Sequence, residues 1–212
     1  MQSKSGKLLQ FFPHFIIIMT LKDRITRHKD GSILFRDSFM EYDDEYVGNV
    51  FADLLKDGTL VRLSQGVYYK PVHTRLGILY PAVSEVITAI AKRDHATILP
   101  TGNTAMYHLG LTTQVPMNYE YLTNGAARQV TVGKHAITLK HGVANNFAFR
   151  GKLMPVLHQA LRAIGQENVT DEHKGQIAAL MVRTPEPRTI KHDLKLLPVW
   201  ERSLVKPLIP NN

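Results

Sequence analysis

Side chains that could bind duplex DNA gather between residues 36 and 70. Lysine and arginine neutralise phosphates, asparagine and glutamine can hydrogen-bond an adenine edge, and tyrosine can donate to a phosphate oxygen. We take Asn49 as the candidate for a base contact and Tyr46 as the candidate for a phosphate contact. The full set that we expect to contact DNA is Arg36, Tyr46, Asn49, Lys56, Arg62, Gln65, Tyr68 and Lys70.

The elements that would position these side chains follow from the spacing of apolar residues. We expect a helix over residues 21–28, a short helical turn over 36–40 and a longer amphipathic helix that ends at 56. The longer helix has one apolar stripe, formed by Val47, Val50, Phe51, Leu54 and Leu55. Asp57-Gly58 would end this helix, and residues 59–63 and 67–70 predict two strands around a turn. This order predicts a winged helix-turn-helix, a unit that most often reads DNA.

Three carboxylates, Asp43, Asp44 and Glu45, stand where the longer helix begins. Asp43 or Asp44 can cap the helix, and negative charge is favourable beside the free N–H groups of a first turn. The same carboxylates would repel phosphates near that end. Two uses of the unit therefore stay open, namely DNA binding, or protein contacts and dimerisation.

Other residue types that could do chemistry give no catalytic or metal-binding pattern. His135 and His141 could project from one face of a strand, but no metal-ligand spacing accompanies them. Residues 100–104 could hold an anion through backbone N–H groups, although Thr101 or Asn103 as a helix cap is the simpler interpretation. Gly133-Lys134 lacks the spacing of a phosphate loop. We expect neither an enzyme nor a bound cofactor or metal.

The composition indicates a folded protein with an uneven charge. The 212 residues are 44% hydrophobic and carry a net charge of +8, without any cysteine, so disulfides and thiolate zinc sites are excluded. Residues 126–212 contain thirteen lysines and arginines against six carboxylates, and residues 21–72 contain eight against nine. A basic field of this kind attracts polyanions, but it also suits a solvated surface.

An apolar run over residues 8–19 precedes the first helix. It is too short to span a bilayer and no small-residue cleavage site follows it. We expect translation to begin at Met19; a targeting segment, or an arm that packs on the body or on a second subunit, is the alternative.

The rest of the chain predicts a second, mixed unit after a linker. We expect the linker over residues 73–80, with Pro81 at the first position of the next helix. A strand over 96–99 and a short helix closed by Gly110 come next. Residues 119–123, 128–132 and 135–140 predict an antiparallel meander with turns at Asn124-Gly125 and Gly133-Lys134. Helices follow over 153–164, after Thr170, and on both sides of Pro198.

Several segments of the chain, most of them in this second unit, resemble AbiEi-like antitoxins of type IV toxin–antitoxin systems. The similar segments are residues 99–105 (LPTGNTA), 109–116 (LGLTTQVP), 121–125 (YLTNG) with Arg128, the 66–69 wing (GVYY), and the tail from 191–195 (KHDLK) to Trp200. The resemblance covers about residues 19–205. It implies a phage-defence protein with an N-terminal winged helix that represses its own operon, and a C-terminal domain that counteracts a nucleotidyltransferase-like toxin, without necessarily forming a tight complex with it.

We therefore expect an α+β protein in four parts: residues 1–19 as an apolar extension, 20–72 as the winged helix-turn-helix, 73–80 as the linker and 81–206 as the antitoxin-like helix and antiparallel-meander domain. The expected function is that of a cytoplasmic antitoxin and autorepressor, which binds its own operator as double-stranded DNA, as a homodimer or as cooperating monomers, and binds no membrane. The alternatives are a winged-helix adaptor that binds protein and, less favoured, an enzyme acting on nucleotides or RNA.

Overall fold

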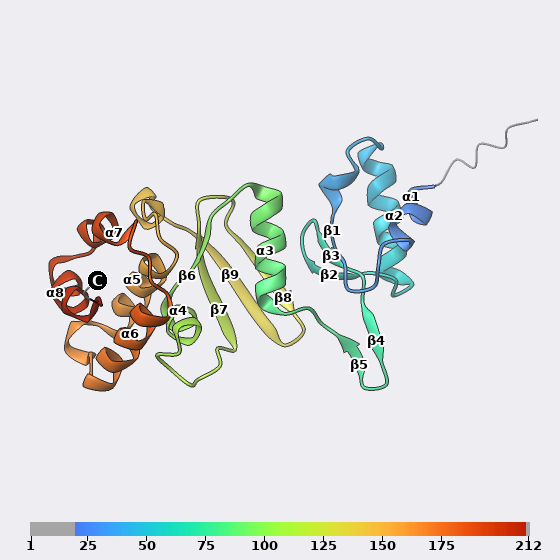
Figure 1. Cartoon of the computed structure of the whole chain (residues 1–212). Helices are drawn as coiled ribbons and strands as arrows, with labels where there is room; N and C mark the ends of the chain where they lie inside the picture. The colour runs from blue at the N-terminus through green and yellow to red at the C-terminus, as the bar shows by residue number, and fades with distance from the viewer. Residues whose placement is uncertain (1–19, 211–212) are drawn as a thin grey trace, which may run out of the picture.

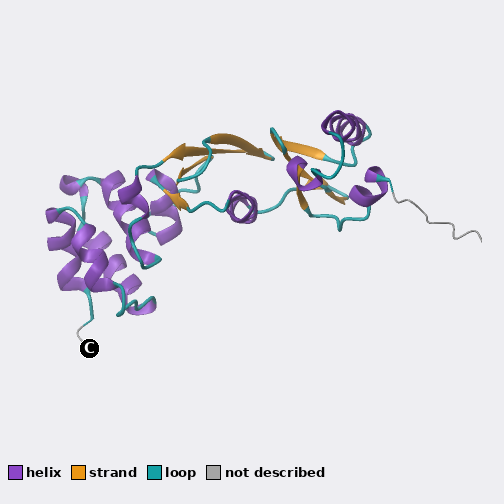
Figure 2. Cartoon of the chain, turned by 90° about the horizontal axis from the view of Figure 1, so that it is seen from above, coloured by secondary structure: helices purple, strands orange, loops and turns teal. Residues whose placement is uncertain are grey.

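A computed structural model describes residues 20–210 of the chain. The apolar run over residues 8–19 lies outside the described residues. The described chain is elongated: a small helix-and-sheet unit lies at the N-terminal end, a second sheet lies in the middle, and a group of helices forms the C-terminal end (Figures 1 and 2). The protein is therefore of the α+β class, as the sequence predicted.

The N-terminal unit contains the helices that the apolar pattern predicted and one strand that it did not. Its elements are α1 (Leu21–Thr26), β1 (Ile33–Phe35), η1 (Arg36–Phe39), α2 (Asp44–Lys56), β2 (Val61–Ser64) and β3 (Val67–Tyr69). The three strands form an antiparallel sheet in the order β1-β3-β2. The strand β1 was missed because it has only three residues, fewer than an alternating pattern needs to be recognised.

Local side chains set the limits of α2 as predicted. Asp43 is the N-cap, and its Oδ1 accepts from the N–H of Tyr46 at 3.0 Å. After Lys56 the chain turns at Gly58, whose φ of 77° is readily adopted only by glycine. The apolar stripe of α2 packs into a core with α1, η1 and the sheet, in which the ring of Phe51 lies 5.8 Å from that of Phe39. This core fixes α2 across one face of the sheet.

The expected linker over 73–80 contains most of a two-stranded antiparallel hairpin, which the sequence did not predict. Its strands are β4 (Val72–Thr74) and β5 (Gly77–Leu79). Gly77 has a φ of 111° at the turn, and the Thr74 hydroxyl donates to the Gly77 carbonyl at 2.8 Å. The Tyr69 hydroxyl donates to the Leu79 carbonyl at 2.6 Å and ties the hairpin to β3.

The second sheet is mixed, and the predicted meander was wrong. It contains β6 (Ile98–Pro100), β7 (Asn118–Thr123), β8 (Arg128–Val132) and β9 (His135–His141) in the order β6-β7-β9-β8. The turn at Gly133 joins β8 to β9 as predicted, but β7 pairs with β9 in parallel.

Asn124-Gly125 does not close a hairpin because it is tied to the start of β6. Asn124 Oδ1 accepts from the Thr97 N–H at 2.7 Å, and the Thr123 hydroxyl accepts from the Gly125 N–H at 3.0 Å. The chain therefore leaves the sheet here, and β8 adds to the far edge of β9.

The helix α3 (Val83–Asp94) packs on one face of the second sheet, on the side of the N-terminal unit (Figures 1 and 2). It begins two residues after Pro81, because Ala82 is its N-cap, and the Ala82 N–H donates to Glu85 Oε2 at 3.0 Å. Its buried residues Val86, Ile87 and Ile90 share one core with residues of both sheets, among them Leu63 and Val130. The two sheets are thus joined by common packing.

The remaining helices form the C-terminal group. They are α4 (Gly102–Leu109), η2 (Ala144–Phe147), α5 (Leu153–Ile164), η3 (Gln166–Asn168), α6 (Asp171–Arg183), α7 (Ile190–Leu196), α8 (Val199–Val205) and η4 (Lys206–Leu208). Gly110 and Gly165 end α4 and α5, and Thr170 caps α6, as predicted. None of the helices in residues 20–210 is long and apolar enough to cross a membrane.

Candidate nucleic-acid interface

A groove of about 690 Å³ separates η1 and α2 from the β2–β3 turn. Of the residues predicted to contact DNA, Arg36, Arg62, Gln65 and Tyr68 line it. The lack of a side chain at Gly48 makes room for the guanidinium of Arg36 in this groove, because a Cβ at that position would lie 3.2 Å from it. The fold thus brings half of the predicted residues together on one surface.

Arg36 links η1 to the first turn of α2. One of its terminal nitrogens donates to the backbone carbonyl of Asp44 and to the Asp44 carboxylate, each at 2.8 Å. The contact offsets one of the three carboxylates that begin α2, and the Asp43 carboxylate caps the helix. Glu45 is exposed on the same turn, with no ion pair in the part of the chain that the structure describes.

Five of the predicted residues are exposed around the groove and along α2: Tyr46, Asn49, Lys56, Arg62 and Gln65. The Tyr46 side chain is 43% exposed, and its ring lies 6.2 Å from that of Tyr42. Arg62 leans along its own strand, where its Nε donates to the Ser64 carbonyl at 3.4 Å. Arg62 and Gln65 line the groove, whereas Tyr46, Asn49 and Lys56 are exposed on α2 outside it.

Tyr68 and Lys70 require a correction, because both serve the interior of the N-terminal unit. The ring of Tyr68 is 7% exposed and lies 4.5 Å from that of Phe51. The Lys70 ammonium donates to the backbone carbonyls of Thr26 and His28 at 2.7 Å each and pairs with Asp30 at 2.9 Å. Both residues therefore leave the predicted set of DNA contacts.

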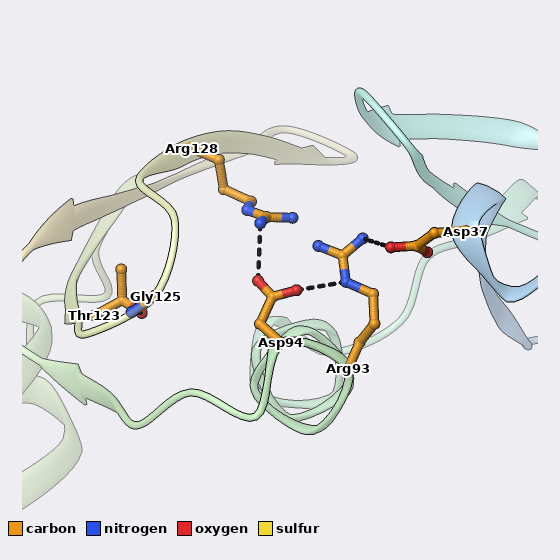
Figure 3. Close-up of polar contacts among 6 residues, drawn as sticks. All are labelled: Asp37, Arg93, Asp94, Thr123, Gly125 and Arg128. Atoms are coloured by element: carbon orange, nitrogen blue, oxygen red, sulfur yellow. Dashed lines mark hydrogen bonds and ion pairs between the residues drawn. The ribbon is translucent and has the colours of Figure 1, made fainter.

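Arg93, from α3, completes the edge of the groove and was not predicted. Its guanidinium lies 4.7 Å from the centre of the Phe35 ring and pairs with Asp37 at 3.4 Å. Arg93 also pairs with Asp94 at 2.5 Å, and Asp94 pairs with Arg128 of β8 at 2.8 Å (Figure 3). Fifty-six residues separate Arg93 from Asp37, so no local sequence pattern could have indicated this contact.

The other residues considered for chemistry are dispersed. No group of three or more potential metal ligands occurs within residues 20–210. His141 is exposed at the end of β9, whereas His135 is partly buried at its start. Thr101 is the N-cap residue of α4, but its hydroxyl donates to Gln159 Oε1 at 2.8 Å and makes no cap bond to the helix. The predicted cap position is therefore confirmed at Thr101, but its side chain does not cap the helix, because the buried Gln159 amide competes for the hydroxyl.

No curated protein and no solved structure matches the chain. Residues 20–189, which include the N-terminal unit, the second sheet and α4 to α6, match the model of a described protein family. The match covers most of the sequence, and the chain thus belongs to DUF6088, described as a family of unknown function.

Proposed function

We propose that residues 20–72 form a winged helix that binds duplex DNA, with α2 as the recognition helix and the β2–β3 turn as the wing. One observation carries this proposal: the chain order α1, β1, η1, α2, β2, β3 is combined with the sheet order β1-β3-β2. In that arrangement α2 and the β2–β3 turn border one groove, and both carry exposed side chains that DNA can contact.

The contacts we propose follow from the exposed side chains. Asn49 reads a base edge in the major groove, and Tyr46 donates to a phosphate. Arg62 and Gln65 hold the backbone from the wing, and Lys56 holds it from the end of α2. Arg36 supports this mode indirectly, because its pairing with Asp44 reduces the negative charge at the start of α2.

We further propose that the protein is a cytoplasmic antitoxin that represses its own operon and counteracts a nucleotidyltransferase-like toxin. The support is the resemblance of residues 99–128 and of the tail to AbiEi-like antitoxins. The excess of lysine and arginine over residues 126–212 would add affinity for DNA. The protein would act by binding, as a monomer or homodimer and without a cofactor.

The experiment measures DNA binding by the full chain and its variants at a series of salt concentrations, with fluorescence anisotropy as the readout. Arg62→Ala should weaken binding to all sequences alike and lower the salt slope by about one. Asn49→Ala should reduce the preference for the chain's own upstream region.

Arg75→Ala is the matched control, because it removes the same charge from an exposed position in the β4–β5 turn, outside the proposed contacts and outside residues 126–212. An equal loss of slope in the Arg62 and Arg75 variants would mean that a general basic field binds DNA. That result would contradict a wing contact.

A second candidate function is protein binding by the same unit. Glu45 and Asp53 are exposed on α2, and Met40, which lines the groove, is 83% exposed. An acidic and apolar surface of this kind favours a protein partner over phosphates. A stable complex with the neighbouring gene's product, combined with no binding to DNA, would support this adaptor function.

The antitoxin role has its own test. Co-expression of the chain should restore growth to cells that produce the toxin encoded beside it. The variant Asn49→Ala should still restore growth, because toxin neutralisation is assigned to the C-terminal part. Failure of the unaltered chain to restore growth would reject the antitoxin role and leave DNA binding untouched.

A further inference from the structure

A second cavity, distinct from the interface described above, opens between the β4–β5 hairpin and the second sheet. It has a volume of about 1020 Å³, at the upper end of the range for small-molecule sites. Side chains from β5, the start of α3, the end of α4, β7 and the β8–β9 turn line it. We call it the tyrosine cleft, after the tyrosines among its lining residues, Tyr80, Tyr107, Tyr119 and Tyr121.

The aromatic side chains of the tyrosine cleft are arranged at two depths. Tyr80 and Tyr107 are each 37% exposed, so their rings are accessible to a ligand. Tyr119 and Tyr121 are 8% and 2% exposed and form the floor. Burial raises the pKa of Tyr121 to about 12, so its hydroxyl keeps its proton.

His108 adds a neutral polar group to this floor. Its Nε2 lies 3.4 Å from the Tyr121 hydroxyl, and burial lowers the pKa of its imidazole. The imidazole is therefore uncharged near neutral pH. It can exchange a hydrogen bond with a base edge without attracting a second anion.

The charge of the tyrosine cleft has one sign. Lys134 and His135 come from the β8–β9 turn, and the described lining residues include no carboxylate. Lys134 forms no ion pair within residues 20–210, in contrast to Lys70 and Lys140. The cation is therefore available to an anionic ligand.

His135 has an unsatisfied polar atom in the same place. Its Nδ1 is buried and has no hydrogen-bond partner among the described residues, and its ring lies 5.5 Å from that of Tyr119 in an edge-on arrangement. A buried polar atom without a partner is costly, so rotation of the His135 ring toward a ligand in the cleft would gain a hydrogen bond.

The aromatic and cationic groups are adjacent. A Cβ at Gly133 would lie 3.2 Å from the Tyr80 ring, so this glycine lets the ring pack directly on the β8–β9 turn that carries Lys134. Tyr80 and Lys134 line the same cleft, so a ligand that joins a flat ring to an anion can contact both. Aromatic side chains beside cations are the usual means of binding unpaired bases and their phosphates.

We propose that the tyrosine cleft binds a nucleoside phosphate, either free or as one unit of a single-stranded nucleic acid. The base stacks on Tyr107 or Tyr80, and the phosphate is held by Lys134 with His135 beside it. The cleft lies apart from the α2 groove, and the two sites share no lining residue. This activity is therefore independent of the proposed binding of duplex DNA.

The test is calorimetric titration of the full chain with nucleoside monophosphates and, in a second arm, with short single-stranded oligonucleotides. We expect one bound mononucleotide per chain, and the matching nucleoside without phosphate should bind about tenfold more weakly. Binding by the oligonucleotides alone would assign the site to single strands. Either result supports a nucleoside phosphate as the ligand.

Two variants assign the binding to this cleft. Lys134→Ala and Tyr107→Ala should each weaken binding about tenfold, and Lys195→Ala, an exposed lysine of α7, should leave it unchanged. Thermal unfolding of each variant checks that the fold is intact. If Tyr107→Ala is unfolded, Tyr107→Leu replaces it, because leucine keeps an apolar side chain and removes the aromatic surface, so binding should still weaken.

Three results would overturn the proposal. The first is no binding in either arm at about millimolar ligand. The second is binding that Lys134→Ala and Tyr107→Ala leave unchanged. The third is binding of an acidic peptide, such as oligoglutamate, in preference to both kinds of nucleotide.

Discussion

Lysines of this protein that look alike in the sequence have different structural roles. Lys56 lies at the surface of α2, whereas Lys70 donates to two carbonyls at the end of α1 and just after it, and fixes α1 against β3. A sequence pattern places both residues beside a turn or helix end. It does not record that the chain folds back over forty residues to bring Thr26 and His28 to Lys70.

Lys70→Met should destabilise the protein by about 1–3 kcal/mol, because the aliphatic stem is kept and the buried acceptors lose their charged donor. Lys56→Met, the exposed control, should change the free energy of unfolding by less than about 0.5 kcal/mol. Urea unfolding followed by circular dichroism measures both. Equal stability of the two variants would show that the Lys70 contacts contribute nothing.

Asp193 gives a pH-dependent prediction. Burial acts to raise the pKa of this carboxyl, but the N–H groups of Arg150 and Gly151 and the His192 side chain donate to it and hold its pKa below the ordinary value. A carboxyl with a lowered pKa in the folded state stabilises the fold above the unfolded pKa. That stabilisation is lost as the pH falls through the folded pKa, below about pH 4.

The variant Asp193→Asn should therefore be less stable near neutral pH and should lose less stability on acidification than the unaltered chain. Asp53→Asn, at an exposed position of α2, should keep the original pH dependence. Chemical unfolding at a series of pH values provides the measurement. Parallel curves for the unaltered chain and Asp193→Asn would contradict the account.

At the scale of elements, the sequence predicted helices better than strand partners. Caps and stripes are local, so Asp43, Gly58 and Gly110 marked the helix ends correctly. Strand pairing depends on distant residues, and Asn124-Gly125 has the composition of a hairpin turn. Its place against β6 is decided by Ala96 and Thr97, which no pattern within the turn could indicate.

Gly125→Ala tests this packing. A Cβ at Gly125 would lie 2.9 Å from the Ala96 Cβ, so the substitution should destabilise the protein by about 1–3 kcal/mol. Gly175→Ala is the matched control, because no atom lies within 4 Å of its added Cβ in α6. The control should stabilise the helix by about 0.5–1 kcal/mol. Changes of the same sign in both variants would contradict the described pairing of β7.

At the scale of the whole molecule, the expected division into two units at residues 73–80 did not include the contacts that join the N-terminal unit to the second sheet and α3. Leu63 and Tyr69 share a core with α3 and the second sheet. The chain of ion pairs from Asp37 through Arg93 and Asp94 to Arg128 crosses the same boundary (Figure 3). The DNA-binding surface we propose is therefore attached to the body by packing and charge.

Asp94→Ala should weaken this joint, since it leaves Arg93 and Arg128 partly buried and close together. The loss should be about 2 kcal/mol in the free energy of unfolding. Asp171→Ala, which breaks the exposed pair with Lys174, should cost less than about 1 kcal/mol. A cost for Asp94→Ala no larger than for Asp171→Ala would mean that the ion pairs do not hold the two parts together.

The most direct test of the proposed function is a mobility-shift titration of the full chain on its own upstream region and on an unrelated duplex of equal length, at low and at physiological salt. We predict that both duplexes bind at low salt, and that only the upstream region stays bound at physiological salt, because base contacts from α2 are less sensitive to salt than phosphate contacts. Equal loss of both complexes at physiological salt would contradict sequence reading by α2, and would leave the basic C-terminal part as the source of the binding.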